Sequence, residues 1–135
     1  MKLTTALRST IAQAMIDAMA TGTASTPMIE IYSGTIPGAM GGTISDTLLA
    51  ELAMTNGAAT QASGAITLDA ITNDNAANAT GTAGWARIVD RDGAEVIYLT
   101  VTNASGTGDI KLNTTALASG SPVAITSGAI TVGGA

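Results

Sequence analysis

The chain contains neither cysteine nor histidine. Without thiolates or imidazoles it has no means of forming a disulfide, a serine–histidine–aspartate triad, a cysteine–histidine dyad or a zinc site built on those ligands. These side chains supply most nucleophiles and bases that act near neutral pH. The sequence therefore predicts a protein that is not an enzyme and that carries no cofactor and no metal site of this kind.

Aromatic and charged side chains are also scarce. There is no phenylalanine, one tryptophan and two tyrosines, so a core must be built from Ile, Val, Leu, Met and Ala. Charged residues make up 11% of the chain, against about 25% in an ordinary domain, and the net charge is −5. The five basic residues are scattered, which argues against binding of nucleic acid. A weakly charged surface rich in small residues is suited to contact with other protein, including copies of the same chain.

Long apolar runs are missing as well. No segment reaches the roughly 18 residues of a membrane span, so no membrane partner is expected. The first 20 residues begin like a secretory signal, but Arg8, Gln13 and Asp17 interrupt the apolar stretch. We expect this segment to remain as a helix.

The length of 135 residues predicts a single domain over 1–135, with an N-terminal helix or arm over 1–22 and a β body over 28–135. Apolar residues in the first segment recur at helical spacing: Leu3, Leu7, Ile11, Met15 or Ala14, and Ala18 or Met19. Thr4 or Thr5 is a candidate N-cap, and Gly22 stands where helices commonly stop. The helix either lies over the sheet of its own chain or forms an arm that docks on a neighbouring subunit.

Beyond residue 27 the periodicity becomes alternating, and glycines, serines and threonines mark turns. Residues 28–33 read as a strand, followed by a glycine-rich, exposed loop over 33–42. Residues 46–55 suit a strand or a short helix, and we favour a strand because of the neighbouring pattern. A further strand pattern places Ile66, Leu68 and Ala70 on one face.

The firmest local prediction is a hairpin over 85–101, because Asp92-Gly93 lies between two alternating runs. Residues 109–113 alternate as a half-buried strand. In the final segment the apolar positions change from odd to even around Ser127-Gly128, which predicts a bulge or bend there. Together these patterns predict a mainly β fold, an antiparallel β-sandwich of about seven or eight short strands with one N-terminal amphipathic α-helix.

Three groups of residues are of the types that could carry chemistry. Asp90, Asp92 and Glu95 are close in sequence, but they fall at the predicted hairpin tip, where carboxylates usually serve a solvated turn. Trp85 and Tyr98 are candidates for a sugar-binding patch, although anchoring of the core is the favoured interpretation.

The segment around 73–81 offers oxygen ligands that calcium accepts: Asp69, Asn73, Asp74, Asn75 and Asn78. It lacks the spacing of an EF-hand, so a polar turn is favoured and cation binding in loop 73–81 stays open.

The order of segments resembles that of small virion proteins of tailed bacteriophages. The resemblance covers nearly the whole chain and is carried by MIEIYSGTIPG, by ATGTAGWARIVDRDG and by LNTTALASGSPVAITSGAITV. One departure is Ala86, where the family has an aromatic residue. The resemblance implies a capsid decoration (cement) protein, made in the host cytoplasm and bound to the major capsid protein on the capsid exterior. Partners would be that protein and other copies of this chain, as a dimer or trimer.

Two alternatives remain at this point. One is a tail, neck or other virion component, and the other is a bacterial surface or glycan-binding module. For the virion role, contacts are expected from the N-terminal segment and the glycine-rich loop. The candidate interaction residues are Leu3, Leu7, Ile11, Met15, Gly34, Ile36, Pro37 and Met40.

Overall fold

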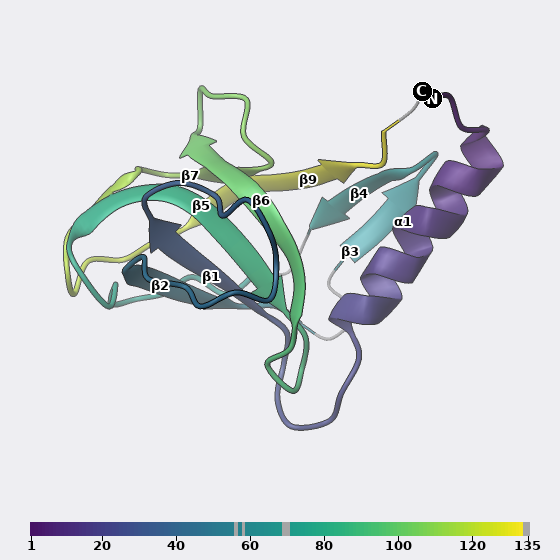
Figure 1. Cartoon of the computed structure of the whole chain (residues 1–135). Helices are drawn as coiled ribbons and strands as arrows, with labels where there is room; N and C mark the ends of the chain where they lie inside the picture. Colours follow the sequence, from purple (N-terminus) through teal and green to yellow (C-terminus); the bar gives the residue numbers. More distant parts are fainter. Residues whose placement is uncertain (56, 58, 69–70, 134–135) are drawn as a thin grey trace.

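The computed structural model describes residues 1–133 apart from 56, 58, 69 and 70. It is mainly β with one N-terminal helix, which confirms the predicted class (Figure 1). The elements are α1 (Thr5–Met19), β1 (Met28–Ser33), β2 (Leu48–Ala53), β3 (Ala59–Ala62), β4 (Ala65–Leu68), β5 (Gly81–Val89), β6 (Glu95–Asn103), β7 (Ile110–Leu112), β8 (Ala116–Leu117) and β9 (Ile125–Thr131).

The strands form one curled, hydrogen-bonded path in the order β2-β1-β5-β6-β7-β9-β4-β3, and β8 pairs with β5. The predicted antiparallel pairing needs one correction, because β6 and β7 run parallel. The chain doubles back between them through a short loop in which the N–H of Gly108 donates to Thr102 Oγ1 at 3.1 Å. A Cβ at Gly106 would lie 2.5 Å from the Cβ of Thr102, so the return is close-packed.

Alternation along β1 builds one side of the core. Ile29 and Ile31 are fully buried in the main apolar cluster. The segment 46–55 forms the predicted strand, with Ile31 paired to Ala50 across β1 and β2. Its Ala, Leu and Glu residues favour helix by propensity, but pairing with β1 buries Leu49 and Leu52 and outweighs that preference.

The predicted hairpin is confirmed as β5 and β6, with Arg87 opposite Tyr98. The N–H of Asp90 donates to the carbonyl of Ala94 at 2.9 Å to close the turn. Gly93 has φ +86°, a left-handed conformation that glycine adopts without strain.

Other strand predictions differ in detail. β4 covers Ile66 and Leu68, whereas Ala70 lies outside the described residues. The expected irregularity in the last strand falls at Thr126, because Lys111 pairs with Ser127 and Leu112 with Ile125. The short strands β3 and β8 had no sequence signal strong enough to predict them.

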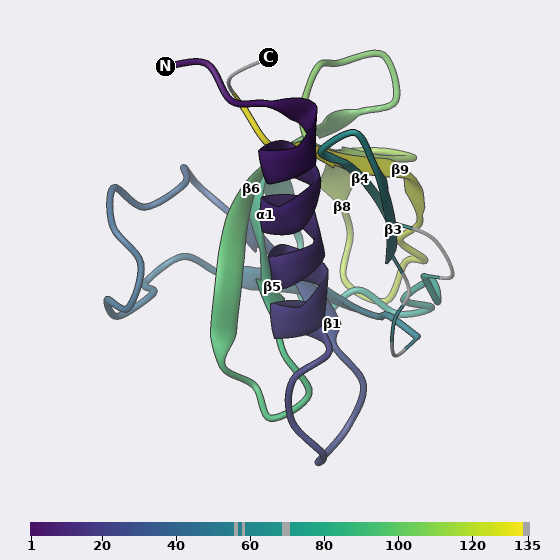
Figure 2. The ribbon, with the colours of Figure 1, turned by 90° about the vertical axis from the view of Figure 1, so that its right-hand side faces the viewer.

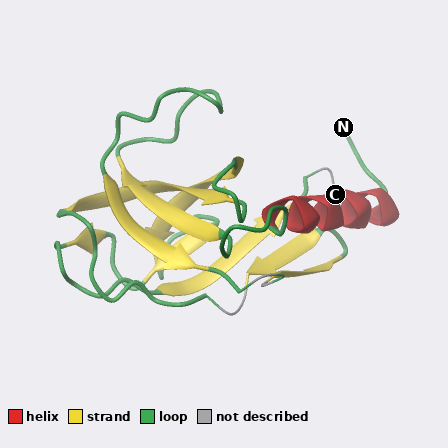
Figure 3. Ribbon diagram, turned by 90° about the horizontal axis from the view of Figure 1, so that it is seen from below, coloured by secondary structure: helices red, strands yellow, loops and turns green. Residues whose placement is uncertain are grey.

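Helix α1 lies beside β3 and β4 of its own chain (Figure 1) and also contacts β6. Seen from below, the helix lies at one end of the strands (Figure 3). Thr4 caps it, since Thr4 Oγ1 accepts from the N–H of Leu7 at 3.2 Å. Its buried side chains are Ala12, Ile16 and Met19, which join the main apolar cluster.

Only part of the stripe predicted to be the apolar face of α1 faces the sheet: Met15 packs against the main core and Met19 is buried in it, whereas Leu7 and Ile11 are exposed. Leu7 is 47% exposed and Ile11 36% exposed, while Leu3 and Met15 are half-buried. The helix is apolar on two sides, and the sheet takes the side that presents Ile16. The other side stays accessible to solvent.

The linker after α1 is tied to the β5–β6 turn. The N–H groups of Thr23 and Ala24 both donate to Asp92 Oδ1 at 2.9 Å. The Nε of Arg91 donates to the carbonyl of Ser25 at 2.8 Å. These bonds fix the point at which the chain leaves the helix and enters β1.

Candidate functional site

The strands β1, β5 and β6 carry a second cluster of large side chains on the face opposite the main core, here called the outer face. Alternation places Glu30 and Tyr32 of β1 there, and pairing sets them beside Arg87 and Trp85 of β5. Tyr98 of β6 follows, opposite Arg87. The segment 34–47, called loop 34–47, leaves β1 and projects from this side of the sheet (Figure 2).

Aromatic rings form the centre of the outer face. Tyr32 stacks on Trp85 with ring centroids 4.7 Å apart and an interplanar angle of 15°. Tyr98 packs on the other side at 4.9 Å, tilted by 56°. Trp85 is 0% exposed, so it is buried as predicted, yet it belongs to this outer cluster and not to the main one. A fully buried indole offers no ring surface on which a sugar could stack.

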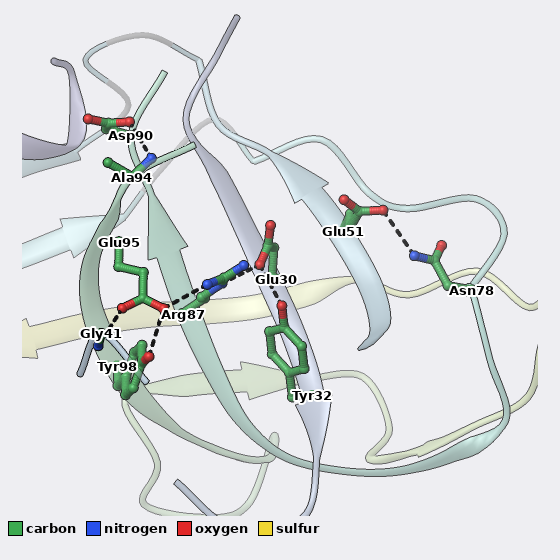
Figure 4. Close-up of polar contacts among 10 residues, drawn as sticks. All are labelled: Glu30, Tyr32, Gly41, Glu51, Asn78, Arg87, Asp90, Ala94, Glu95 and Tyr98. Carbon is green, nitrogen blue, oxygen red and sulfur yellow. Dashed lines mark hydrogen bonds and ion pairs between the residues drawn. The ribbon is translucent and has the colours of Figure 1, made fainter. Parts of the chain in front are cut away.

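A charged network lies beside the rings (Figure 4). Arg87 is held between two carboxylates: its Nε donates to Glu30 and its Nη1 to Glu95 Oε1 at 2.8 Å. Its guanidinium carbon lies 5.6 Å from the centroid of the Tyr32 ring. Burial opposes the charge of Arg87, but hydrogen bonding to Glu30 and the charge of that carboxylate raise the pKa of Arg87 above its ordinary value.

The two tyrosine hydroxyls are part of the same network. The Tyr32 hydroxyl donates to Glu30 Oε2, and the Tyr98 hydroxyl to Glu95 Oε1, each at 2.8 Å. Burial, with the hydrogen bond to Glu30, raises the pKa of Tyr32 to about 12. Both hydroxyls therefore stay protonated and act as donors at neutral pH.

Loop 34–47 is fastened to the outer face near both ends. At its start, Gly34 crosses Gly84, the extra residue of a bulge where Tyr32 pairs with Trp85 and Ser33 with Ala83. A Cβ on Gly84 would collide with the carbonyl oxygen of Gly34, so only glycine fits there. Near its end, Asp46 Oδ2 accepts from Trp85 Nε1 at 2.9 Å.

A third contact fastens the middle of the loop. The N–H of Gly41 donates to Glu95 Oε2 at 2.9 Å (Figure 4). The donors around Glu95, with the Tyr98 hydroxyl first and then Gly41 and Arg87, lower the pKa of this carboxyl below its ordinary value. One carboxylate thus joins β5, β6 and the loop.

Between the contacts at Gly34 and Gly41 the chain forms an arch, residues 35–40. The arch exposes Ile36 at 42% and Met40 at 48%, while Pro37 is half-buried. Among the described residues, the large exposed hydrophobic side chains are Met1, Leu7, Ile11, Ile36 and Met40. All five fall in the two segments from which contacts were predicted; α1 packs on the main core, whereas loop 34–47 is fastened to the outer face.

The three clustered carboxylates of the hairpin have separate partners. Asp90 Oδ1 accepts from the N–H groups of Asp92 and Ala94 within the turn, at 3.0 and 2.8 Å. The N–H groups of Thr23 and Ala24 lower the pKa of Asp92, which holds the linker. Glu95 holds the loop. The three groups therefore do not converge on a shared point, and each organises a different segment.

Loop 73–81 forms a polar turn. Asp74 accepts from the N–H of Glu51 at 3.1 Å and from that of Ala76 at 2.9 Å. The side chain of Asn78 donates to Glu51 at 2.9 Å (Figure 4). Asp69 lies outside the described residues. In the part of the chain that the structure describes, no three acidic side chains gather at one point.

A small cavity lies between the end of α1 and the segment after β2, lined by Ile16, Met19, Pro27 and Met54 among others. Its volume is about 10 Å³, room for about one water molecule. It does not offer a place for a substrate or cofactor.

No family model, no curated protein sequence and no solved structure matches the chain. Within the described ranges, no helix has both the length and the apolar character needed to cross a bilayer.

The arrangement is suited to contact, because it presents neutral apolar side chains on a loop that rigid strands hold in place. The sequence indicated the loop but not the contacts that hold it, which Asp46, Gly84 and Glu95 make, nor the pair Glu30 and Arg87 that positions Glu95. A signal was present: Trp85 and Arg87 are two apart on a strand, so they share a face, and the Asp92-Gly93 turn sets Arg87 opposite Tyr98.

Proposed function

We propose that the chain is a structural protein of a tailed-phage virion, a capsid decoration protein that binds the major capsid protein on the outer surface of the shell. The observation that carries the proposal is the placement of the exposed large apolar side chains. Leu7 and Ile11 form the outer stripe of α1, Met1 precedes that helix, and Ile36 and Met40 belong to the arch 35–40. No other large apolar side chain among the described residues is exposed to this degree.

The chemistry of these surfaces supports the proposal. Loop 34–47 contains a single charged residue, Asp46, and that carboxylate accepts a hydrogen bond from Trp85. A neutral apolar arch on a rigid sheet gains affinity by burying Ile36 and Met40 and loses little by ordering, because Gly34, Gly41 and Asp46 are already held. The lack of cysteine and histidine fits a role without catalysis.

Sedimentation of shells with the chain tests the proposal. Purified shells of the tailed phage that encodes the chain are mixed with increasing amounts of the chain and pelleted. We expect the amount of bound chain to saturate at a fixed ratio to the capsid subunits. The double variant Ile36→Ser and Met40→Ser should weaken binding at least tenfold, since each buried side chain contributes about 1.5 to 3 kcal/mol and a tenfold loss is about 1.4 kcal/mol.

The matched control is a double variant in exposed polar residues of the same loop, Thr35→Ala and Thr43→Ala. This variant should bind shells as the parent chain does. Shells that never saturate, or an apolar double variant that binds like this control, would reject the proposed docking role. Purified tails, run in parallel, separate a head protein from a tail component.

A further inference from the structure

The N–H of Gly41, in the middle of loop 34–47, donates to Glu95 of β6 at 2.9 Å. Glu95 uses both oxygens: Oε1 accepts from Arg87 and Tyr98, and Oε2 accepts from Gly41. Every partner of Glu95 except Gly41 belongs to β5 or β6. Contacts within the sheet therefore fix the position of the carboxylate, and the middle of the loop is hydrogen-bonded to it.

We infer that Glu95 is the latch of loop 34–47: its charged carboxylate holds Gly41, and with it the apolar arch 35–40, over the outer face, and loss of that charge releases the arch. The arch lies between two fastened glycines, Gly34 and Gly41. Cutting the contact at Gly41 leaves residues 35–45 fastened only next to the strands, at Gly34 and Asp46.

The surroundings of Glu95 determine how the latch responds to acid. The charged and titratable groups around it are Arg87 on β5 and Tyr98 on β6, with Glu30 and Tyr32 of β1 beyond Arg87. The donors that face Glu95 lower its pKa relative to the unfolded chain. The latch is therefore complete above the ordinary glutamate pKa of about 4.3, and it is lost as pH falls through the lower pKa of the folded chain.

This inference rests on the proposed function in one respect, because the arch carries the residues proposed to dock. Its primary test does not need a shell. Amide hydrogen exchange at Gly41, measured by NMR in the full chain, reports the latch directly, and the amide of Gly42 serves as an internal reference. A hydrogen bond to a charged acceptor is strong enough that Glu95→Ala should speed exchange at Gly41 about ten- to a hundredfold.

The matched control is Glu51→Ala, which removes an exposed carboxylate that accepts from Asn78 and has no contact with the loop. It should leave exchange at Gly41 unchanged. In case Glu95→Ala perturbs the sheet through Arg87, an acid titration of the parent chain provides a second measurement: the amide shift of Gly41 should follow one carboxyl group with a pKa below about 4.3. Equal protection of Gly41 in Glu95→Ala and the parent, or a Gly41 shift that ignores pH, would overturn the latch.

Shell binding then separates the two proposals. If Gly41 is released in Glu95→Ala and the parent saturates shells, the variant should bind more weakly because the arch must be ordered on docking. If Gly41 is released but the parent chain does not bind shells, the latch stands and the decoration role fails. If the parent binds and Gly41 stays protected without Glu95, the decoration role stands and the latch fails.

Discussion

Helix α1 and loop 34–47 both lie against the sheet, but they are held by different kinds of contact. The helix contributes Ala12, Ile16 and Met19 to the main core, and its attachment is almost entirely apolar. The loop is held by two hydrogen bonds to carboxylates, from the Trp85 indole to Asp46 and from the N–H of Gly41 to Glu95, and by the close crossing of Gly34 and Gly84. Apolar packing does not depend on direction, whereas the contacts of the loop do.

This difference separates global from local stability. A change beneath α1 opens the core that all strands share, so it lowers the free energy of unfolding of the whole domain. A change at a loop contact frees a segment that contributes nothing to the main core, so it alters local opening. On the same sheet, the packing of α1 thus determines the free energy of unfolding of the domain, whereas the contacts of loop 34–47 determine the shape of one surface.

The largest expected effect is the difference in unfolding free energy between substitutions at two isoleucines of α1. Ile16 is 7% exposed and Ile11 36% exposed. Ile16→Ala should lower the free energy of unfolding by about 2 to 5 kcal/mol, because it removes a core side chain. Ile11→Ala should change it by less than about 0.5 kcal/mol. Urea unfolding followed by far-ultraviolet circular dichroism measures both, and similar losses would mean that the outer stripe of α1 also supports the fold.

A second comparison concerns two glycines. Gly84→Ala introduces a Cβ that collides with the carbonyl oxygen of Gly34, whereas Gly38→Ala meets open space in the arch. The first should lower the free energy of local opening of residues 34–47 by about 1 to 3 kcal/mol and so speed amide exchange there, with the free energy of unfolding of the whole domain little changed. The second should leave both quantities close to the parent. If amide exchange in α1 also became faster in Gly84→Ala, local opening of loop 34–47 would not be independent of the stability of the domain.

The smallest effect tests the polar atoms beneath α1. Arg8 Nε and Gln61 Oε1 are buried without a hydrogen-bond partner, and both residues belong to elements of the α1–sheet contact. Gln61→Met keeps the shape and removes the unpaired oxygen, so it should raise the free energy of unfolding by about 1 kcal/mol. Gln13→Met, on the exposed side of α1, is the control; it removes an exposed hydrogen bond to Asp17 and should lower the free energy of unfolding by no more than about 0.5 kcal/mol. A loss of stability in Gln61→Met would show that the amide is paired in solution.

Local patterns predicted the parts of the fold that depend on nearest neighbours in the chain. The hairpin turn at Asp92-Gly93 and the alternation in 28–33 specify strands by themselves. The buried face of α1 was predicted only in part: Met19 belonged to the expected stripe, but Ala12 and Ile16 did not, because helical spacing fits Leu7 and Ile11 as well as it fits them. Only the sheet, assembled from distant strands, decides which side is buried.

The candidate site shows the same limit. Glu30 and Arg87 are 57 positions apart, and Asp46 and Trp85 are 39 apart. Their contacts depend on the register of β1 against β5 and on the bulge at Gly84, which no local pattern reveals. The loop itself was predicted because glycines mark it, and the parallel pairing of β6 and β7 was missed because so short a connection usually joins antiparallel strands.

The aromatic cluster of the outer face has a practical consequence. Trp85, Tyr32 and Tyr98 are all the aromatic side chains of the chain, and they contact one another beneath loop 34–47. The intrinsic fluorescence and near-ultraviolet dichroism of the protein therefore originate at this single place, next to the carboxylate of Asp46. The chain carries its own optical probe of the loop, and the α1 side of the molecule is silent in the same spectra.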